Sequence, residues 1–575
     1  MNATATLVPR LSAAIEHAFG PEYRDEDPVL RPSQFADVQS NASMALAKRV
    51  GMSPRDVAAR IVENLDVAGV CSGVEISGPG FINLQLDDAW IAAQATSTAA
   101  DPRLGVAPQD GLRVVIDYSA PNVAKEMHVG HLRTTVVGDA LARTFEFLGH
   151  SVIRQNHIGD WGTPFGMLIE HLLDVGEGSE EALLLESDPN AFYQAARTKF
   201  DAIPEFATRA RRRVVKLQAE DPDTLRLWRE LVDLSKHYFN RIYSRLRVTL
   251  TDADLAGEST YNDRLAQVCA DLEAAGLATI SDGALCVFLD GYTGREGKPM
   301  PLIIRKSDGG YGYATTDLAA IRHRVEDLEA DLLLYVIGAP QELHLKMVWD
   351  TARKAGWLPD AVQPVHVQIG NVLGEDRKIL KTRSGVPLRL MALLDEAVAT
   401  ARAVMDEDQP DLDEGIRSAV APQVGIGAVK YADLSVAHNS EYVFDLRRMV
   451  SLNGNTSRYL QYATARLRSI FRTADLDPVH VHGSIVVNEP SERALALKIL
   501  AFSDVVEQVA SELEPHRLCG FLFELAQAFS VFYERCPVLK AEPQIRESRL
   551  TLSAATLQAL VTGLDLLGIE APQRM

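Results

Sequence analysis

Hydrophobic and polar residues follow two different periods along the chain, and the first clear one belongs to a strand. In residues 81–86, FINLQL, isoleucine or leucine occupies every second position, which predicts a half-buried β-strand. Residues 1–20 instead show the spacing of an amphipathic helix, and short helical patterns continue to about residue 105. The prolines and glycines of residues 102–111 are typical of a linker. We therefore expect an α+β N-terminal domain, residues 1–108.

A strand, a loop, a helix and a second strand follow the linker in that order. Residues 112–119, LRVVIDYS, are a short β-rich run, and residues 150–160 have the pattern of the next strand. Between them, apolar residues recur at helical spacing, namely Leu132, Val136, Ala140, Leu141 and Phe145. Gly149 stands where that helix would end. The order is typical of an α/β fold with a doubly wound, Rossmann-like parallel sheet.

The rest of the chain divides into a charged helical stretch, a return of strands and a helical end. Long charged helices dominate residues 165–290, so we expect a helical insertion there. Apolar strand-like segments return at residues 301–317, 331–341 and 362–373. After the acidic loop at 406–415 the pattern is helical to the last residue, apart from a break at 474–492. This predicts an α/β domain at residues 109–400 and an all-α domain at 401–575.

Composition places the chain among soluble globular proteins of two to four domains. It has 575 residues, of which 47% are hydrophobic and 24% are charged. No apolar run approaches the roughly 20 residues needed to cross a bilayer. The first 20 residues lack the basic start of a signal peptide, so we expect a cytoplasmic protein without membrane contact. The net charge of −20 argues against a partner such as DNA that is bound over a wide surface.

The cysteines exclude two structural roles. Five are scattered through the chain without a CxxC pair: Cys71, Cys269, Cys286, Cys519 and Cys536. We therefore expect neither a disulfide scaffold nor a structural zinc site, and no other metal site.

The segment PNVAKEMHVGH, residues 121–131, carries the candidate chemistry. A helix that begins after a parallel strand presents free N–H groups and a partial positive charge, which suit a phosphate. His128 and His131 lie on its first turn, and Gly130 between them lets a nucleotide approach the backbone. Lys125 adds a positive charge. Alternatively, the histidines are a metal pair or surface residues, although no third ligand with metal-like spacing follows.

This segment resembles the HIGH signature of class I aminoacyl-tRNA synthetases, and the whole string is similar to that of arginyl-tRNA synthetases. Six further segments resemble the same family in the expected order: GFINLQL, GESTYND, RKSDGGYGYATTDLAA, YVIGAPQELH, SRYLQYATAR and LLGIEAPQRM. The resemblance implies that arginine and Mg²⁺-bound ATP form arginyl-adenylate, which is then transferred to the 3′-terminal ribose of tRNA(Arg). It also implies a monomer that needs bound tRNA for the first step.

An arginine substrate needs carboxylates placed for bidentate contact with its guanidinium. Asp117 ends the first strand, while Tyr313 and Asp317 lie four apart near a later strand. The resemblance places these three around the guanidinium, and places Ser119, Asn122, His131 and Gln341 around the amino and carboxylate groups. Taken alone, Asp317 is also a candidate helix N-cap, and Tyr313 a candidate core residue.

A second signature of the class, the KMSKS loop, departs from its usual pattern here. The corresponding segment is GEDRKILKTRSGVPL, residues 374–388, in which Leu380, Lys381, Thr382 and Arg383 replace the middle of that string. The usual second lysine is missing. Lys381, Arg383 and Lys125 are the candidates for the cation that stabilises the leaving pyrophosphate. By resemblance, the ATP contacts are His128, Gly130, His131, Leu380 and Lys381.

A local basic segment is the candidate RNA surface. Residues 447–472 contain six arginines and no acid, and Tyr459, Tyr462 and Arg466 lie among them. In the alternative interpretation one tyrosine is in the core and half of the arginines form ion pairs. The resemblance adds Tyr533 and Met575 as anticodon contacts. Residues 209–216, RARRRVVK, are a second basic patch for the acceptor arm.

Three competing functions stay open on the sequence. One is a class I synthetase for another amino acid, against which Asp117 and Asp317 both argue. Another is an RNA-binding paralogue that has lost catalysis, favoured only by the altered KMSKS loop. The third is a hydrolase with a histidine-bound metal.

Overall fold

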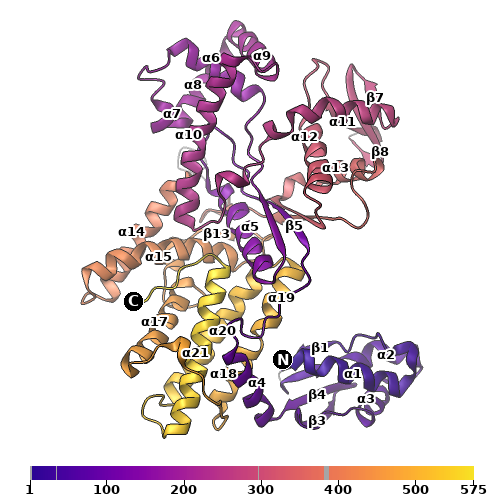
Figure 1. Cartoon of the computed structure of the whole chain (residues 1–575), viewed down its shortest axis with the longest axis vertical. Coiled ribbons are helices and arrows are strands. Elements are labelled where there is room, and N and C mark those ends of the chain that lie inside the picture. The colour runs from indigo at the N-terminus through magenta and orange to yellow at the C-terminus, as the bar shows by residue number, and fades with distance from the viewer. Residues whose placement is uncertain (1–2, 34, 295–296, 381–387) are drawn as a thin grey trace.

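The N-terminal domain is a four-stranded antiparallel sheet with helices packed on it. A computed structural model describes residues 3–33, 35–294, 297–380 and 388–575 (Figure 1). The strand order is β1-β2-β4-β3. The strands are β1 (Leu30–Pro32), β2 (Val38–Ser40), β3 (Cys71–Ser77) and β4 (Phe81–Leu86), and the helices are α1 (Ala3–Phe19), α2 (Ala42–Val50), α3 (Pro54–Glu63) and α4 (Asp88–Ala100). The strand and the amphipathic helix predicted from the sequence are confirmed as β4 and α1.

A four-stranded parallel sheet forms the centre of the chain, in the order β11-β10-β5-β6. Its elements are β5 (Arg113–Asp117), α5 (Val129–Phe147), β6 (Ser151–Gln155), α12 (Tyr313–Arg322), β10 (Leu332–Gly338), α13 (Glu342–Lys354) and β11 (Gln363–Ile369). The predicted doubly wound sheet is confirmed. From β5 the chain runs outward to β6, whereas from β10 it runs to β11 on the other side. The switch point lies between β5 and β10, and open α/β sheets bind ligands at such a point.

The insertion between β6 and β10 has two parts. The first is helical: α6 (Thr163–Val175), α7 (Leu184–Ser187), α8 (Pro189–Ala202), α9 (Pro204–Gln218) and α10 (Pro222–Leu246). The second packs α11 (Asn262–Ala274) with an antiparallel sheet of β7 (Ala278–Ser281), β8 (Ala284–Thr293) and β9 (Pro299–Arg305). The expectation of helix as far as residue 290 was wrong, and β9 does not join the parallel sheet. A short apolar run such as residues 285–289 fits a buried helix or a strand equally well.

The C-terminal part is helical, as predicted. It contains α14 (Leu390–Asp408), α15 (Glu414–Leu434), α16 (Leu446–Met449), α17 (Ser457–Ala474), α18 (Pro490–Leu500), α19 (Phe502–Glu512), α20 (His516–Arg535) and α21 (Pro543–Leu566). One small exception is β13 (Tyr442–Val443), which pairs in parallel with β12 (Val372–Leu373). Two-residue strands carry no periodic signal, so this pair could not be predicted from the pattern of residues. The boundaries predicted at residues 108 and 400 stay a prediction.

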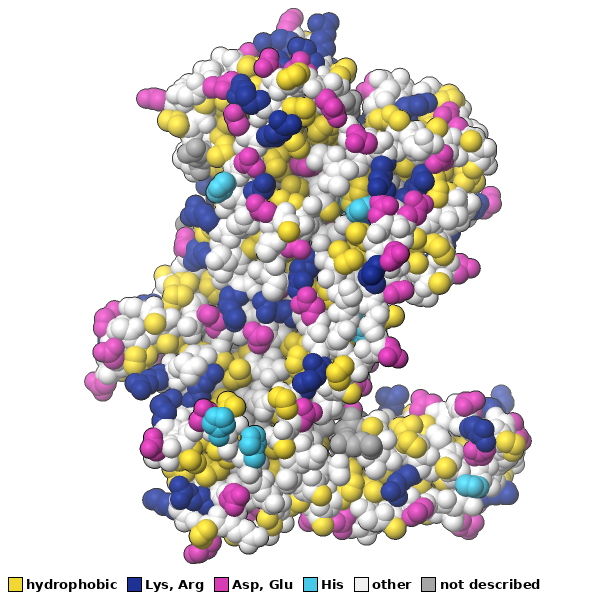
Figure 2. Space-filling model, in the orientation of Figure 1, with side chains coloured by type: hydrophobic (Ala, Val, Ile, Leu, Met, Phe, Trp, Pro, Cys, Tyr) yellow, Lys and Arg dark blue, Asp and Glu magenta, His cyan; other side chains and the backbone are white. Residues whose placement is uncertain are grey.

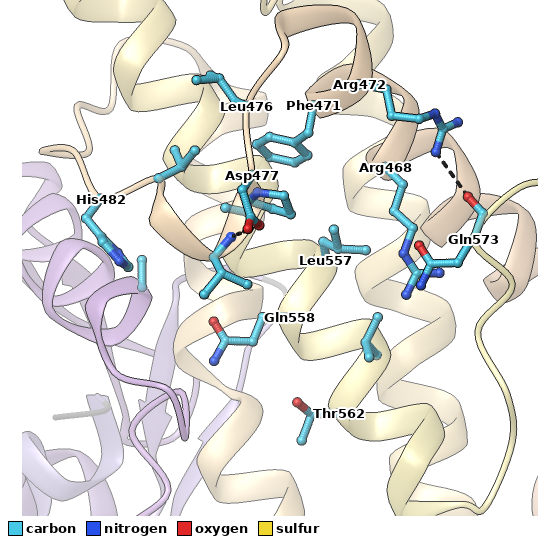
Figure 3. A pocket seen from close by; sticks show the side chains of 16 residues that line it. Arg468, Phe471, Arg472, Leu476, Asp477, His482, Leu557, Gln558, Thr562 and Gln573 are labelled. Carbon is cyan, nitrogen blue, oxygen red and sulfur yellow. Dashed lines mark hydrogen bonds between the residues drawn. The ribbon is translucent and has the colours of Figure 1, made fainter.

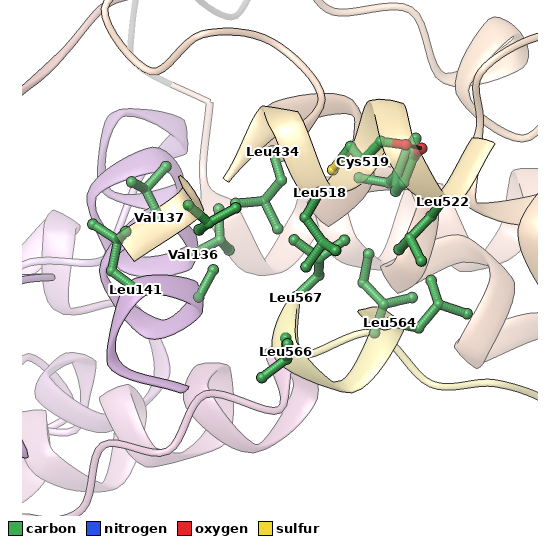
Figure 4. Close-up of a cluster of buried hydrophobic side chains, with 14 of the residues drawn as sticks. Val136, Val137, Leu141, Leu434, Leu518, Cys519, Leu522, Leu564, Leu566 and Leu567 are labelled. Carbon is green, nitrogen blue, oxygen red and sulfur yellow. Dashed lines mark hydrogen bonds between the residues drawn. The ribbon is translucent and has the colours of Figure 1, made fainter. Parts of the chain in front are cut away.

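Helix α5 joins the parallel sheet to the C-terminal helices through a shared core. Figure 4 shows Val136, Val137 and Leu141 of α5 beside leucines of α15, α20 and α21. A buried ion pair reinforces this contact, because Nε of Arg133 on α5 lies 2.7 Å from Oδ1 of Asp433 on α15. Both side chains are almost fully buried. The start of α5 is therefore held in a fixed position against the helical part.

Candidate active site

Both histidines of the HVGH segment are built into the start of α5. His128 is its N-cap, and Nδ1 of His128 accepts a hydrogen bond from the backbone N–H of Gly130 at 3.1 Å. In return, Nδ1 of His131 accepts from the backbone N–H of His128 at 3.1 Å, which completes a capping box. The two ring centroids lie 4.0 Å apart. Each ring uses its Nδ1 for the helix, and no hydrogen bond to either Nε2 is found among the described residues.

The protonation of these rings follows from their surroundings. Burial and, to a smaller extent, the neighbouring His128 lower the pKa of His131 to about 3. Burial also lowers the pKa of His128, with a smaller contribution from Lys125. Both rings are therefore neutral at pH 7, and because Nδ1 accepts, the proton is assigned to Nε2. The helix start presents two N–H donors without a net charge on either ring.

Lys125 and the loop before α5 are fixed by contacts outside the helix. Nζ of Lys125 lies 4.3 Å from the centroid of the Tyr193 ring on α8. The backbone N–H of Val129 donates to the carbonyl of Leu388 at 3.0 Å, and the N–H of Leu390 donates to Met127 at 2.9 Å. The backbone around HVGH is thus paired with the last residue of the KMSKS-like segment and with the start of α14.

The KMSKS-like segment is only partly described. Lys381 and Arg383, predicted as catalytic cations, lie outside the described residues, as do Thr382 and Gly385. Leu380, the last described residue before this gap, donates its N–H to the carbonyl of Val372 on β12 at 2.9 Å. The predicted ATP contacts of Leu380 and Lys381 stay a prediction.

Asp117 already binds a guanidinium that belongs to the chain itself. Its Oδ2 accepts from Nη2 of Arg324 at 2.7 Å, and both side chains are buried. Nε of Arg324 donates to Gln155 at 2.7 Å, and the Tyr335 ring lies 5.0 Å from the guanidinium carbon. Oδ1 of Asp117 is buried without a hydrogen-bond partner among the described residues, whereas most buried polar atoms have one.

The structure decides against the alternative roles of Asp317 and Tyr313. Helix α12 begins at Tyr313 with Gly312 as its N-cap, so Asp317 lies inside the helix and is no cap. Oδ2 of Asp317 lies 2.6 Å from Nε2 of His344 on α13, and this hydrogen bond raises the pKa of His344. Tyr313 is 74% exposed, which excludes a core role. Tyr313 is thus at the surface, whereas one carboxylate oxygen of Asp317 is held by His344.

Glu258 is the acidic residue that our sequence analysis missed. It begins a short turn in the GESTYND segment. Burial raises its pKa to about 7, and the negative charges of Asp160 and Asp317 contribute to the shift. Glu258 and Tyr313 line one cavity of about 560 Å³, together with Trp161 and Thr316. A carboxyl so destabilised by neighbouring acids is a strong candidate for pairing with a cationic ligand.

The remaining predicted arginine contacts lie around the carboxyl ends of β5 and β10. Ser119 is buried, and its Oγ lies 2.9 Å from Thr135 and 2.8 Å from the Tyr243 hydroxyl. Asn122 and Gln341 are both exposed, the latter after β10. Ser119 thus has hydrogen-bond partners within the protein, whereas Asn122 and Gln341 are open to a ligand.

The arginines of the basic patch, residues 209–216, fall into two groups, one that forms ion pairs and one that lines a cavity. Arg209 and Arg213 pair with Asp174 and Glu170 on α6 at 2.9 and 2.7 Å. Arg211 and Arg212 instead line the cavity that contains Glu258. Two arginines of the patch therefore hold α9 against α6, while two line the cavity that contains Glu258.

The predicted RNA residues have different surroundings. Tyr462 is 37% exposed, whereas Tyr459 is half-buried against Phe523, with ring centroids 5.5 Å apart. The guanidinium carbon of Arg466 lies 4.2 Å from the centroid of Tyr533. Met575 packs against the cluster formed by α14 and α15. Tyr459 thus packs within the protein, as the alternative interpretation of the basic segment expected for one of its two tyrosines.

The described residues contain no group of three or more His, Cys, Asp or Glu side chains arranged to hold a metal ion. In the same part of the chain, no helix is both long and apolar enough to span a membrane. On the face shown in Figure 2, acidic and basic side chains are interspersed.

Comparison with known families agrees with this geometry. Residues 96–446 match the catalytic domain of class I (R) tRNA synthetases, residues 460–575 match the DALR anticodon binding domain, and residues 6–86 match the arginyl tRNA synthetase N terminal domain. The parallel sheet and the histidine pair at the start of α5 therefore define a class I tRNA synthetase.

The similar proteins give the family. An arginine–tRNA ligase of Thermobifida fusca is 69% identical over 99% of each chain, and one of Frankia casuarinae is 52% identical over 98% of this chain and 97% of that protein. The crystal structure of arginyl-tRNA synthetase from Plasmodium falciparum has a TM-score of 0.86 at 27% identity, covering 100% of this chain and 99% of that chain. The chain belongs to the arginine–tRNA ligase family.

Arginine binding is expected to depend on pH through Glu258. A carboxyl with a pKa of about 7 is largely neutral below that pH, so it loses the charge that attracts a guanidinium. Protonation of Asp160, whose pKa burial also raises, acts in the same direction. We expect kcat/KM for arginine to fall as the pH drops through 7, by at most roughly tenfold per unit for each proton. Initial rates from about pH 6 to about pH 8.5 measure this, and a flat profile would contradict it.

Proposed function

We propose that the chain joins L-arginine to tRNA(Arg) in two steps. The arginine carboxylate attacks the α-phosphorus of Mg²⁺-bound ATP, the bond to the β-phosphate oxygen breaks, and pyrophosphate leaves. A hydroxyl of the terminal ribose of the tRNA then attacks the carbonyl carbon of the adenylate, and AMP leaves. The observation that carries this proposal is the pair of neutral imidazoles at the start of α5, each of which uses its Nδ1 to accept a backbone N–H of the helix start.

Each part of the site has a task in the first step. The Nε2–H groups of His128 and His131 would donate to phosphate oxygens, where negative charge grows as the carboxylate attacks. Gly130 would allow the nucleotide to approach the helix start, and Lys125, Lys381 and Arg383 would neutralise the departing pyrophosphate. Positioning and electrostatics supply the rate, and the chain needs no covalent intermediate.

The guanidinium is proposed to lie among Glu258, Asp317 and the free oxygen of Asp117, with Tyr313 beside it. Burial and the negative charges of neighbouring acids destabilise the charged form of Glu258, and a bound cation would offset this cost. Asn122, His131, Gln341 and Ser119 would then surround the amino and carboxylate groups. Because Ser119 is buried between Thr135 and Tyr243, we expect it to act mainly by fixing the end of β5.

The tRNA is proposed to contact three parts of the chain. Tyr462, Arg466, Tyr533 and Met575 would read the anticodon loop, with Tyr459 supporting them. Arg211 and Arg212 would meet the acceptor arm, and the N-terminal domain, residues 1–108, would contact the outer corner of the tRNA. The basic residues lie in local clusters in an otherwise acidic chain, as such contacts require. We further propose that the chain acts as a monomer in the cytoplasm, that its domains are residues 1–108, 109–400 and 401–575, and that bound tRNA is required for the first step.

Arginine-dependent exchange of pyrophosphate into ATP, with and without tRNA(Arg), tests this function. We expect exchange with arginine and tRNA together, little without tRNA, and none with other amino acids. Absence of exchange with retained tRNA binding would identify an RNA-binding paralogue instead. Exchange with another amino acid would identify a different class I synthetase.

Tyr462→Ala is expected to weaken tRNA binding specifically. Stacking of one base on an aromatic ring contributes about 1–3 kcal/mol, so KM for tRNA should rise roughly tenfold. Because Tyr462 is exposed, the midpoint of thermal unfolding should not change. Tyr459→Ala is the matched variant: its ring packs on Phe523, so it should lower the unfolding midpoint. An unchanged KM for Tyr462→Ala would remove this residue from the RNA surface.

A further inference from the structure

A second cavity lies among the C-terminal helices, far from the cavity that contains Glu258. It has a volume of about 540 Å³ and is bounded by α17, α21, the end of α4, the loop at residues 476–482 and Gln573 (Figure 3). This volume lies in the range of roughly 300–1,000 Å³ that is typical of small-molecule sites. It shares no residue with the cavity that contains Glu258 or with the proposed anticodon contacts.

The walls of this C-terminal cavity are mostly apolar. The apolar side chains that line it are Ala99, Phe471, Leu476, Pro478, Val479, Val481, Ala554, Leu557 and Val561. Leu476 and Val479 are exposed to 42% and 70%, so apolar surface remains open at the rim. The cavity therefore fits a ligand with an apolar body.

Two arginines at one side give the C-terminal cavity a positive charge. Arg468 and Arg472 lie one turn apart on α17, and Figure 3 shows them together with Gln573. Among the residues that the structure describes, no ion pair involves either of them, and their hydrogen-bond acceptors are neutral backbone carbonyls. Burial lowers the pKa of Arg468, and the charge of Arg472 adds to this. An anion would relieve the repulsion between these two cations.

The other polar groups of the C-terminal cavity are mostly occupied. Oδ1 of Asp477 accepts from the N–H of Val479 at 3.1 Å. Nε2 of Gln558 donates to the carbonyl of Pro102 at 2.7 Å. His482 and Thr562 complete the polar lining. The two guanidinium groups are thus the main groups available to a charged ligand.

The same arginines hold the C-terminal tail, residues 568–575. Arg468 donates to the carbonyl of Ala571 at 2.8 Å, and Arg472 donates to the carbonyl of Gln573 at 3.0 Å. A carboxylate accepts stronger hydrogen bonds from a guanidinium than a neutral carbonyl does. A bound anion would therefore compete with the tail, which leads directly to Met575.

We propose that the C-terminal cavity binds a small molecule with an apolar body and a single carboxylate, and that binding loosens the tail. The apolar walls hold the body of the ligand, and the two guanidinium groups bind its carboxylate. The effect on tRNA rests on the function proposed above for Met575. The binding itself does not, so the two can fail separately.

Calorimetric titration of the full chain with decanoate tests the binding. We expect saturable one-to-one binding of decanoate and at least tenfold weaker binding of decanol, which has the same body without the charge. Arg472→Met should weaken decanoate binding about tenfold, because one charge-assisted contact is lost. Arg535→Met, an exposed arginine on α20 outside the cavity, is the control and should not change it. Val561→Phe, which fills the cavity, should abolish binding.

Two results would overturn the binding proposal. Equal binding of decanoate and decanol would show unspecific apolar adsorption. Binding of a short single-stranded RNA or of inorganic phosphate, with no binding of decanoate, would show a phosphate site of the RNA surface instead.

A separate measurement, KM for tRNA, tests whether ligand binding loosens the C-terminal tail. Saturating decanoate should raise KM for tRNA several-fold and leave KM for arginine and ATP unchanged, and Val561→Phe should remove this effect. Binding of decanoate without any change in KM for tRNA would refute the link to the tail, while the proposed synthetase activity would still stand.

Discussion

His128→Asn is expected to slow arginine-dependent pyrophosphate exchange roughly 10²- to 10³-fold while leaving the fold intact. Asparagine is a good N-cap, so it can replace Nδ1 of His128 as the acceptor for the N–H of Gly130. It cannot replace the Nε2–H donor on the other side of the ring. The variant therefore separates the structural use of the imidazole from its proposed use at the phosphate.

Single-turnover formation of the adenylate is the appropriate measurement, because it excludes product release. The rate should fall with little change in the unfolding midpoint or in KM for arginine. His480→Asn replaces an exposed histidine in the C-terminal part and should have no effect. If His128→Asn kept the full rate, the imidazole would serve only as a helix cap.

Glu258→Gln should raise KM for arginine roughly 10- to 100-fold. A hydrogen bond to a charged group contributes about 1.5–3 kcal/mol, and the amide keeps the shape of the side chain without its charge. Because this variant has no group that titrates at position 258, the fall in kcat/KM near pH 7 should also become shallower. Steady-state rates over a range of pH give both results.

Citrulline, a neutral analogue of arginine, provides the control for Glu258→Gln. The intact site should reject it, because its buried acids would be left without a cation. In Glu258→Gln the preference for arginine over citrulline should decrease. An unaltered preference together with an unaltered KM for arginine would exclude Glu258 from the guanidinium pocket.

Much of the fold follows from local pattern. The alternation in residues 81–86, the apolar run before Asp117 and the helical spacing after His131 each involve neighbours along the chain, so the sequence displays them directly. The proposed nucleotide site could be located in the sequence for the same reason: its two histidines, its glycine and the start of its helix are all contained in eleven consecutive residues.

The acidic pocket was less predictable because its parts come from distant segments. Asp117 lies 207 positions from the Arg324 that occupies one of its oxygens. Likewise, Asp317 lies 27 positions from His344. Glu258 is one acid among many in a charged stretch, and only burial beside Asp160 and Asp317 distinguishes it. Such pairings depend on packing across the sheet, which no local period records.

The strands of the insertion show the same limit. Residues 284–293 are apolar enough for a buried element, but their pairing with β7 and β9 decides that the element is a strand. A sequence pattern alone does not decide between a short buried helix and a short buried strand.

A crystal structure with ATP and arginine bound tests the central claim most directly. We expect the α-phosphate oxygens within hydrogen-bond distance of Nε2 of His128 and His131, and the guanidinium between Glu258 and Asp317. A nucleotide bound away from residues 128–131, or an arginine side chain that touches neither acid, would contradict the account.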